Sequence, residues 1–283
     1  MAATDTLLVD EQDRVVTLTF NRPERHNATT REMRERLFAE IRAADARQDV
    51  GCIVIRGNGP SFSSGADLVE DIGRGRDPDY QNDYERPLQT DIRMLTAGEG
   101  VYETLAELQT PIIAQVHGFC IAGALDLATS CDLLIAAEDA QLGYPITRNI
   151  ASPPTHMFTY LMGTQWTRYL LFTGDYLDGK TAAEVGLALL AVPAAQLDET
   201  VGRIARRIAS VPKDLLAIHK SICVKALDAM GRPLVQRLAR EADAMAHKTP
   251  VMQRFYEIGL ARGFKEAYAA LDADDAREVG RGR

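Results

Sequence analysis

Two segments decide the fold of this chain: Phe62-Ser-Ser-Gly-Ala-Asp-Leu68, the first turn segment, and His117-Gly-Phe-Cys-Ile-Ala-Gly-Ala-Leu-Asp-Leu-Ala-Thr-Ser-Cys-Asp132, the second. Each follows an apolar, β-branched run, and each places small residues where a strand would turn into a helix. Small residues at such turns let backbone N–H groups approach a ligand without obstruction by side chains. Two such turns that converge on one point would form a pair of donors for a developing oxyanion.

The apolar pattern predicts strands that alternate with helices. Thr29 or Thr30 is placed to cap a helix that runs to about Ala46. Strands are expected at residues 15–20, 52–56, 112–116 and 132–137. Alternation of this kind indicates the α/β class. The strand signals fade from about Leu161 onward, and helices are predicted there at residues 181–186, 197–210, 212–229 and 250–260.

Two further stretches carry a family resemblance. Asn21-Arg-Pro-Glu-Arg-His-Asn-Ala28 turns after the first expected strand, and Thr110-Pro-Ile-Ile-Ala-Gln-Val-His-Gly118 leads into the second turn segment. With the turn segments, they make roughly residues 7 to 230 resemble the crotonase, or enoyl-CoA hydratase/isomerase, superfamily. The resemblance implies an α/β fold, a crotonase-like spiral of ββα repeats over residues 1–200 with a CoA thioester site. It also implies a C-terminal helical trimerisation region over residues 201–283, and a homotrimer or dimer of trimers.

The resemblance assigns the oxyanion donors to the backbone amides of Ala66 and Gly123. A thioester enolate needs its oxygen stabilised, and two fixed N–H donors do this without reorganising during the reaction. Gly123 would stand at the start of a helix, where free N–H groups add to the effect. The resemblance also implies that Ala66, Asp67, Leu68 and Gly123 contact an acyl-CoA substrate, that coenzyme A is part of that substrate, and that no other cofactor is needed. The alternative is that Gly65 and Gly123 only permit tight packing.

Asp126 is the candidate acid–base residue. It lies three residues after Gly123, so on a helix it returns to the same face. It matches the first of two catalytic glutamates in the resembled hydratases, but aspartate is shorter by one C–C bond, about 1.5 Å. Its carboxylate is therefore drawn back unless the backbone or a water compensates. The alternative is an acid that only makes a local helix or loop hydrogen bond.

The second glutamate of the resembled hydratases is absent. It would follow a Gly-x-Pro turn, which here reads Gly143-Tyr-Pro145, and the next residue is Ile146. Isoleucine neither binds water nor carries protons, whereas two carboxylates around one water are how such a site adds water across a double bond. The sequence therefore predicts poor hydration. It predicts poor isomerisation as well, because the family's isomerases typically rely on the same acid.

Polar residues near this position are candidates to replace the missing acid. Arg148 is a candidate partner for Asp126 or for a substrate carboxylate, and His156 has an intrinsic pKa suited to acid–base work. Thr147 and Asn149 are the remaining polar neighbours. Each candidate has a plain alternative, which is a solvated arginine or a histidine that satisfies a local hydrogen bond.

Residues 70–100 form a segment of a different kind. It mixes Gly, Asp, Arg and Pro with Tyr80 and Tyr84 before a helix that starts near Pro87. In the resembled family this segment borders the acyl pocket. It is therefore either a substrate lid or a solvated polar loop.

The composition excludes several functional classes. The 283 residues are 46% hydrophobic and 25% charged, as in an ordinary soluble globular protein, and the net charge of −8 argues against a nucleic-acid surface. No apolar run approaches the roughly 18 residues that cross a bilayer, and the His and Cys spacings match no metal site. The start lacks a signal-peptide pattern, and four cysteines without Cys-x-x-Cys pairing indicate buried, reduced thiols. A cytoplasmic protein without nucleic-acid or membrane partners is expected.

Together these features predict an enoyl-CoA hydratase/isomerase-like enzyme that acts on an acyl-CoA thioester through an enolate. Two rivals keep the same fold. One is a hydrolase or C–C bond lyase for another carbonyl substrate, with His156 or a tyrosine of the 70–100 segment as the base. The other is a non-catalytic acyl-CoA binder.

Overall fold

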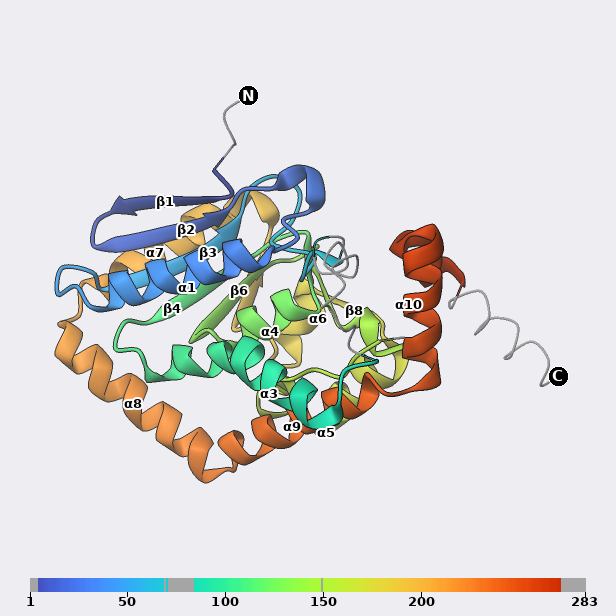
Figure 1. Ribbon diagram of the computed structural model, residues 1–283. Coiled ribbons are helices and arrows are strands. Elements are labelled where there is room, and N and C mark those ends of the chain that lie inside the picture. Colours follow the sequence, from blue (N-terminus) through green and yellow to red (C-terminus); the bar gives the residue numbers. More distant parts are fainter. Residues whose placement is uncertain (1–4, 69, 71–83, 149, 271–283) are drawn as a thin grey trace.

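A mixed sheet forms the centre of the molecule (Figure 1). The computed structural model describes residues 5–68, 70, 84–148 and 150–270. Within these residues β1 pairs antiparallel with β2, and the other neighbours in the sheet are parallel. The strand order is β1 (Leu7–Gln12), β2 (Val15–Phe20), β3 (Cys52–Gly57), β4 (Ile112–Val116), β6 (Leu133–Ala137) and β9 (Leu190–Val192).

A second, smaller sheet carries the second turn segment. Its order is β5 (Phe119–Ile121), β7 (Gln141–Gly143) and β8 (Tyr176–Asp178). The chain crosses from β4 to β5 at Gly118, which has a φ of +53°. A Cβ atom at Gly118 would lie 1.9 Å from the carbonyl oxygen of Pro60, so the crossing requires glycine.

Helices cover the central sheet and extend beyond it, with α8 and α9 along one edge and α10 standing apart at the other side (Figure 1). The helices are α1 (Arg31–Asp45), α3 (Leu88–Gly98), α4 (Gly123–Ser130), α5 (Phe158–Thr173), α6 (Gly179–Glu184), α7 (Leu197–Ala209), α8 (Lys213–Ala229), α9 (Arg232–Ala246) and α10 (Pro250–Arg262). Shorter 3-10 helices are η1 (Pro23–Arg25), η3 (Glu99–Glu107), η4 (Pro145–Arg148) and η5 (Ala194–Gln196).

The main hydrophobic core lies on both faces of the central sheet. All five residues of β4 are buried. Helix α4 packs against β4 and β6, and α7 packs against β2, β3, β4 and β6. Parallel strands that are covered on both faces are apolar throughout, which is why β3 and β4 are recognisable in the sequence.

The expected strands and the α/β class are confirmed, and so is the crotonase fold, by the structural comparisons given below. Thr30 is the cap of α1, because its side chain accepts the Met33 amide at 3.2 Å. Helices α5 and α9, strand β1 and the three-residue strands β5, β7, β8 and β9 were not predicted. Helix α5 is interrupted at Gly163, where φ is +73°, so its apolar spacing is not continuous. The boundary expected at residue 200 stays a prediction, and α7 runs across it with Val201 in the main core.

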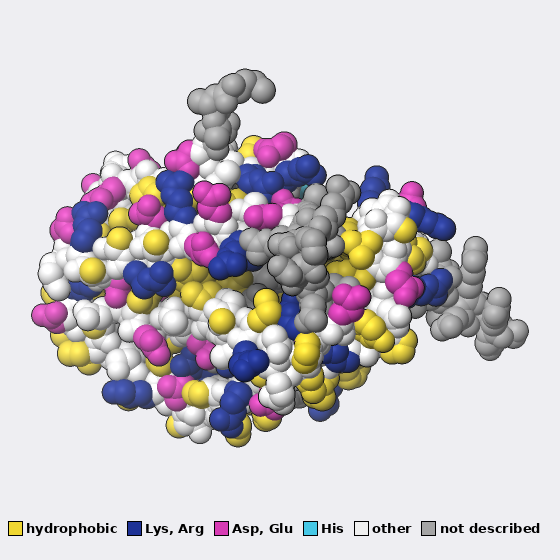
Figure 2. Space-filling model, in the orientation of Figure 1, with side chains coloured by type: hydrophobic (Ala, Val, Ile, Leu, Met, Phe, Trp, Pro, Cys, Tyr) yellow, Lys and Arg dark blue, Asp and Glu magenta, His cyan; other side chains and the backbone are white. Residues whose placement is uncertain are grey.

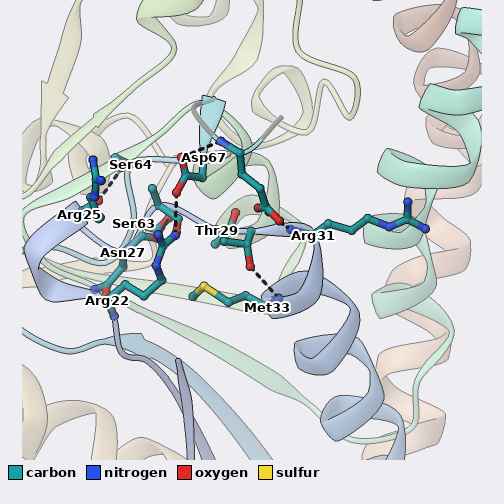
Figure 3. A network of polar contacts seen from close by, with 12 residues as sticks. Arg22, Arg25, Asn27, Thr29, Arg31, Met33, Ser63, Ser64 and Asp67 are labelled. Carbon is teal, nitrogen blue, oxygen red and sulfur yellow. Dashed lines mark hydrogen bonds and ion pairs between the residues drawn. The ribbon is translucent and has the colours of Figure 1, made fainter. Parts of the chain in front are cut away.

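Buried Asn27 holds the first turn segment in place (Figure 3). Its side-chain amide donates to the carbonyls of Asn58 at 2.9 Å and Ser61 at 2.7 Å. Its side-chain oxygen accepts the Arg22 amide at 2.8 Å, and its own carbonyl accepts the Ser63 hydroxyl at 2.8 Å. Its φ of +54° lies in the left-handed region that asparagine tolerates better than most residues. One side chain therefore joins the turn after β2 to the residues that precede Ala66.

We expect Asn27→Ala to lower the free energy of unfolding by about 3 kcal/mol or more, because each buried backbone group left without its partner costs roughly 1–3 kcal/mol. The matched control is Asn21→Ala. The Asn21 side chain is half-buried, donates to the Asp5 carbonyl and accepts from the Asn58 side chain, and both contacts are exposed to water, so its loss should cost less than about 1 kcal/mol. Urea unfolding followed by circular dichroism measures both variants. Equal losses would show that Asn27 is not the fastening point.

Candidate active site

The two turn segments lie side by side. The Ser63 amide donates to the Phe119 carbonyl at 2.9 Å, and the Ile121 amide donates to the Ser63 carbonyl at 3.3 Å. On the other side, the Thr29 amide donates to the Gly65 carbonyl at 2.8 Å. The first turn segment is therefore held between two neighbours by backbone hydrogen bonds.

Gly65 brings the two segments into direct contact. Its φ is +91°, and a Cβ atom there would lie 3.0 Å from the Ile121 carbonyl oxygen and 3.5 Å from the Gly123 nitrogen. Ala66 follows directly, so the two amides expected to bind an oxyanion come from adjoining strands of backbone. Among the described residues, neither the Ala66 amide nor the Gly123 amide donates a hydrogen bond. Neighbouring donors without an internal acceptor are available to a ligand oxygen.

Ala122 sets the direction of Gly123. Its φ of 53° and ψ of −130° are unusual for a residue with a side chain, and its amide is fixed by the Gly143 carbonyl at 3.0 Å. Such strain costs roughly 1–3 kcal/mol and is concentrated at functional sites. Helix α4 starts at the next residue, so its positive end points toward the same place.

An open cavity of about 450 Å³ lies against these turns. The predicted contact residues Ala66, Asp67 and Leu68 line it. Gly123 and Tyr102 instead line a separate chamber of about 10 Å³. That chamber has room for about one water. The remaining wall of the cavity is made by Arg25, Ala28, Ser64, Ile121, Ala122, Pro145, Ile146, Arg148, Tyr176 and Tyr268.

The predicted contact residue Asp67 is paired inside the protein. Its carboxylate accepts the Arg22 guanidinium at 2.9 Å (Figure 3). The same guanidinium donates to the Ala28 carbonyl at 2.7 Å. The Asp67 amide donates to the Thr29 carbonyl at 3.0 Å. Asp67 therefore fastens the end of the first turn segment, and its place on the cavity wall follows from that position.

Asp126 lies on α4, one turn after Gly123, and its side chain is fully buried. The Tyr144 hydroxyl donates to one carboxylate oxygen at 2.7 Å, and the Thr155 hydroxyl donates to the other. Asp126 is not part of the cavity wall. Buried charges need such donors, so the local hydrogen bonds of the alternative interpretation are present. The role of Asp126 in proton transfer stays a prediction.

Ile146 lies on the cavity wall, where the resemblance placed the second glutamate. It packs against the main core and against a second cluster, the C-terminal cluster, made of Ile150, Met252, Phe255, Tyr256 and Ala267. Tyr84 of the 70–100 segment packs against the C-terminal cluster too. This wall of the cavity is therefore apolar.

The structure places the polar neighbours of Ile146, and their role as replacements for the second carboxylate stays a prediction. Arg148 is exposed on the cavity wall, and among the described residues it forms no ion pair with Asp126. The Thr147 hydroxyl donates to the Tyr144 carbonyl at 2.9 Å. Asn149 and Tyr80 lie outside the described residues.

His156 is half-buried, and burial lowers its pKa from the ordinary value. Its ring centroid lies 6.5 Å from that of Phe158, and its φ is +52°. Its ring makes no hydrogen bond with the residues that the structure describes. It does not line the cavity, so a role as catalytic base stays a prediction.

Within the described residues, no helix is long and apolar enough to cross a bilayer. No group of three His, Cys, Asp or Glu side chains there is arranged to hold a metal ion. The expectation of four buried thiols is wrong for Cys223, which is exposed, while Cys131 is half-buried. Cys52 and Cys120 are buried, and burial raises the pKa of the Cys52 thiol to about 12.

Sequence reasoning missed Tyr144, Thr155 and Tyr102. Tyr144 stands at the variable position of the Gly143-Tyr-Pro145 turn, where the family pattern gives no sign of a role. Thr155 is 29 residues from Asp126 in the chain, so no spacing pattern connects them. A buried carboxylate on an apolar helix was the available signal, because such a group requires donors from other elements.

The comparisons with known proteins agree with this geometry. The sequence model of the enoyl-CoA hydratase/isomerase family matches residues 10–267. A probable enoyl-CoA hydratase of Rhizobium meliloti is 34% identical, over 73% of this chain and 76% of its own. A hydroxycinnamoyl-CoA hydratase-lyase of Pseudomonas fluorescens is 30% identical, over 72% of each chain. An enoyl-CoA hydratase structure from Mycobacterium smegmatis has a TM-score of 0.86 and 32% identity, over 95% of this chain and 94% of its own. The chain belongs to the enoyl-CoA hydratase/isomerase family.

Proposed function

We propose that this enzyme acts on an acyl-CoA thioester and stabilises its enolate with the amides of Ala66 and Gly123. The observation that carries the proposal is a pair of adjoining amides, neither of which donates to a described residue, with Ala66 on the wall of the open cavity and Gly123 on the small chamber. A thioester carbonyl that accepts both N–H groups develops its negative charge against fixed dipoles, and removing one such donor typically costs about 10²–10³ in rate. The thioester supplies the acidic α-hydrogen, so no further cofactor is needed.

The charges on the cavity wall suit the coenzyme A part of the substrate. Arg25 and Arg148 both line the cavity and both are exposed. The negative charge of Asp67 is offset by Arg22. The wall therefore presents two exposed guanidinium groups, which bind phosphate oxygens through paired donors. This arrangement supports binding of the coenzyme A phosphates near Arg25 and Arg148 and of the acyl group against the apolar wall at Ile146.

Asp126 is the proposed proton-transfer group. It stands one helical turn from Gly123, and its carboxylate is held by two hydroxyls.

Since Ile146 carries no second carboxylate, we propose that addition of water to a double bond is slow. The same apolar wall favours the second candidate, a C–C bond lyase or hydrolase that forms an enolate at the α-carbon. A non-catalytic acyl-CoA binder is the remaining alternative, and turnover of an acyl-CoA panel excludes or establishes it.

The surface supports a proposal for assembly and surroundings. Apolar side chains are exposed along α8 and α9, at the lower edge of the view in Figure 2, and include Leu215, Ile218, Ile222, Leu234 and Leu238. Burial of that edge against further copies would stabilise the homotrimer or dimer of trimers. The cysteines that the structure describes form no disulfide, which supports a reducing, cytoplasmic location.

We expect Gly123→Pro to reduce enolate formation by about 10²–10³, because proline removes the N–H donor. Proline is well accepted at the first position of a helix, which Gly123 occupies. The control Gly123→Ala keeps the N–H, and its Cβ would meet only the Tyr102 hydroxyl at 3.7 Å. Exchange of the α-protons of butyryl-CoA in D₂O measures the enolate. Unchanged exchange in a folded Gly123→Pro protein would rule out this donor.

We expect Asp126→Asn to reduce the same exchange by about 10²–10⁴, because it removes the charge and the basicity while keeping the size. Binding of butyryl-CoA, measured by calorimetry, should remain close to that of the unmodified enzyme. The control is Asp175→Asn, since Asp175 is exposed and bonded to Tyr169. Joint loss of binding and exchange would give Asp126 a structural role, and full exchange would remove it from the mechanism.

We expect the unmodified enzyme to hydrate crotonyl-CoA poorly and Ile146→Glu to raise that rate, because the new carboxylate can hold and activate water. The gain is limited by the short reach of Asp126, so Ile146→Glu combined with Asp126→Glu should exceed either single change. Burial of the new acid opposes the gain at a cost of several kcal/mol, on the order of 2–7, if it finds no partner. Ile146→Gln controls for size without a proton carrier. Fast hydration by the unmodified enzyme would show that another residue activates water.

A further inference from the structure

We propose that Tyr144 and Thr155 are positioning residues that orient the Asp126 carboxylate, and that helix α9 holds Thr155 in place. This inference rests on the proposed function, because it takes Asp126 as the proton-transfer group. It adds two residues to the site and gives the C-terminal helices a part in its construction.

The contacts between the three side chains are direct and dry. The Tyr144 hydroxyl donates to one oxygen of Asp126 at 2.7 Å, and the Thr155 hydroxyl donates to the other. The exposed fractions are 2% for Tyr144, 1% for Thr155 and 0% for Asp126. A hydrogen bond to an ionised acceptor is roughly twice as strong as a neutral one, and burial removes competing water.

Two hydroxyls from different parts of the chain fix the plane of the carboxylate. Tyr144 stands just before η4 and Thr155 just before α5, while Asp126 belongs to α4. An ionised carboxylate offers about four acceptor sites, and the two hydroxyls occupy one on each oxygen. This orientation matters more for aspartate than for a longer glutamate, because the shorter side chain has less reach to correct a misplaced head group.

Tyr144 connects Asp126 to the cavity. Pro145 and Ile146 follow it in the chain, and both line the cavity. The Tyr144 ring packs against the ring of Phe158 at a centroid distance of 5.9 Å. The hydroxyl that holds Asp126 is therefore fixed relative to the cavity wall.

Helix α9 anchors the loop that carries Thr155 on both sides. Before Thr155, the Ser152 amide donates to the Asp243 carboxylate at 2.8 Å. After it, the Gln236 side chain donates to the Met157 sulfur at 3.6 Å. Asp243 and Gln236 are 4% and 2% exposed, so both contacts are shielded from solvent. The position of the Thr155 hydroxyl thus depends on α9, a helix about 80 residues further along the chain that does not line the cavity.

The test combines hydroxyl removal with a readout of ionisation. Thr155→Val and Tyr144→Phe each delete one hydroxyl and keep the shape. We expect exchange of butyryl-CoA α-protons in D₂O to fall about ten- to hundredfold in kcat, since misplacement of a reacting group by about 1 Å costs rate on that scale. The KM should change little, and Thr155→Ser should restore the rate.

The pH profile separates positioning from general damage to the fold. The two hydroxyls stabilise the ionised form of Asp126, so deleting one raises the pKa of Asp126. The acid limb of the exchange profile should therefore move up by about one to two pH units, the strength of a hydrogen bond to a charged acceptor. The nearby Cys120 thiol does not interfere, because burial, with Cys131 and Asp126 beside it, raises its pKa.

Two matched controls remove the same kind of hydroxyl from residues that do not contact Asp126. Thr167→Val removes the hydroxyl of a buried threonine that donates to the Gly163 carbonyl at 2.8 Å. Tyr169→Phe removes a tyrosine hydroxyl that donates to exposed Asp175 at 3.0 Å. Neither control should move the acid limb. For α9, Asp243→Ala should move it in the same direction as Thr155→Val, and Asp243→Asn, which keeps an acceptor for Ser152, should restore it.

The outcomes are distinguishable from a failure of the proposed function. Folded Thr155→Val and Tyr144→Phe proteins with an unmoved acid limb would overturn the inference while the proposed function stands. If the unmodified enzyme exchanges no α-protons, the proposed function falls. Titration of ¹³C-labelled aspartate carboxyls, with Asp126→Asn for assignment, then still decides whether the hydroxyls hold Asp126. Should Thr155→Val fail to fold, Tyr144→Phe carries the same measurements, because it removes the other hydroxyl that binds Asp126.

Discussion

The hydrogen bonds on both sides of the first turn segment constrain everything else in the site. Backbone pairs join this segment to Thr29 on one side and to the second turn segment on the other. Asn27 reinforces the first of these joins, because its buried side chain binds the Arg22 amide and the carbonyls of Asn58 and Ser61, which precede the first turn segment. If either side separated, the amides of Ala66 and Gly123 would no longer adjoin. Stabilisation of an oxyanion requires this kind of preorganisation, since donors that must first be brought together lose much of their benefit.

The second constraint acts from the C-terminal helices. Fully buried Asp91 of α3 accepts the Arg86 guanidinium at 2.6 Å and a ring nitrogen of His247 at 2.9 Å. His247 comes directly after α9, so this buried cluster ties α9 to α3. Removing one partner from such a buried pair typically costs about 3–5 kcal/mol, which makes displacement of α9 unfavourable. The loop before α5 is bound to α9 through Asp243. Because α9 is held in place, movement of the Thr155 hydroxyl on that loop is restricted as well.

The sequence predicted the parts of the molecule that depend on local pattern. Apolar runs predicted β2, β3, β4 and β6. The first and second turn segments predicted Ala66 and Gly123, which lie on adjoining backbone, and the Gly143-Tyr-Pro145 turn predicted Ile146, which lies on the cavity wall. The short strands of the second sheet were not predicted, because three residues carry too little periodicity to distinguish a strand from a turn. The hydroxyl partners of Asp126 were not predicted either. Their positions follow from how α4, η4 and α5 pack, and tertiary packing of this kind has no signature in a single sequence.

An apolar residue at position 146 affects the two kinds of chemistry proposed for the site, enolate formation at the α-carbon and water addition at the β-carbon, to different degrees. In the proposed mechanism the two amides bind the thioester oxygen, and that effect does not depend on what happens at the β-carbon. A water molecule beside Ile146 would lose a hydrogen-bond partner on that side, which disfavours its retention there. A drier wall also strengthens the hydrogen bonds that remain, because fewer solvent dipoles compete with them. The arrangement thus supports chemistry at the α-carbon over addition at the β-carbon, and the proposed proton-transfer group for it is the Asp126 carboxylate, which two hydroxyls hold.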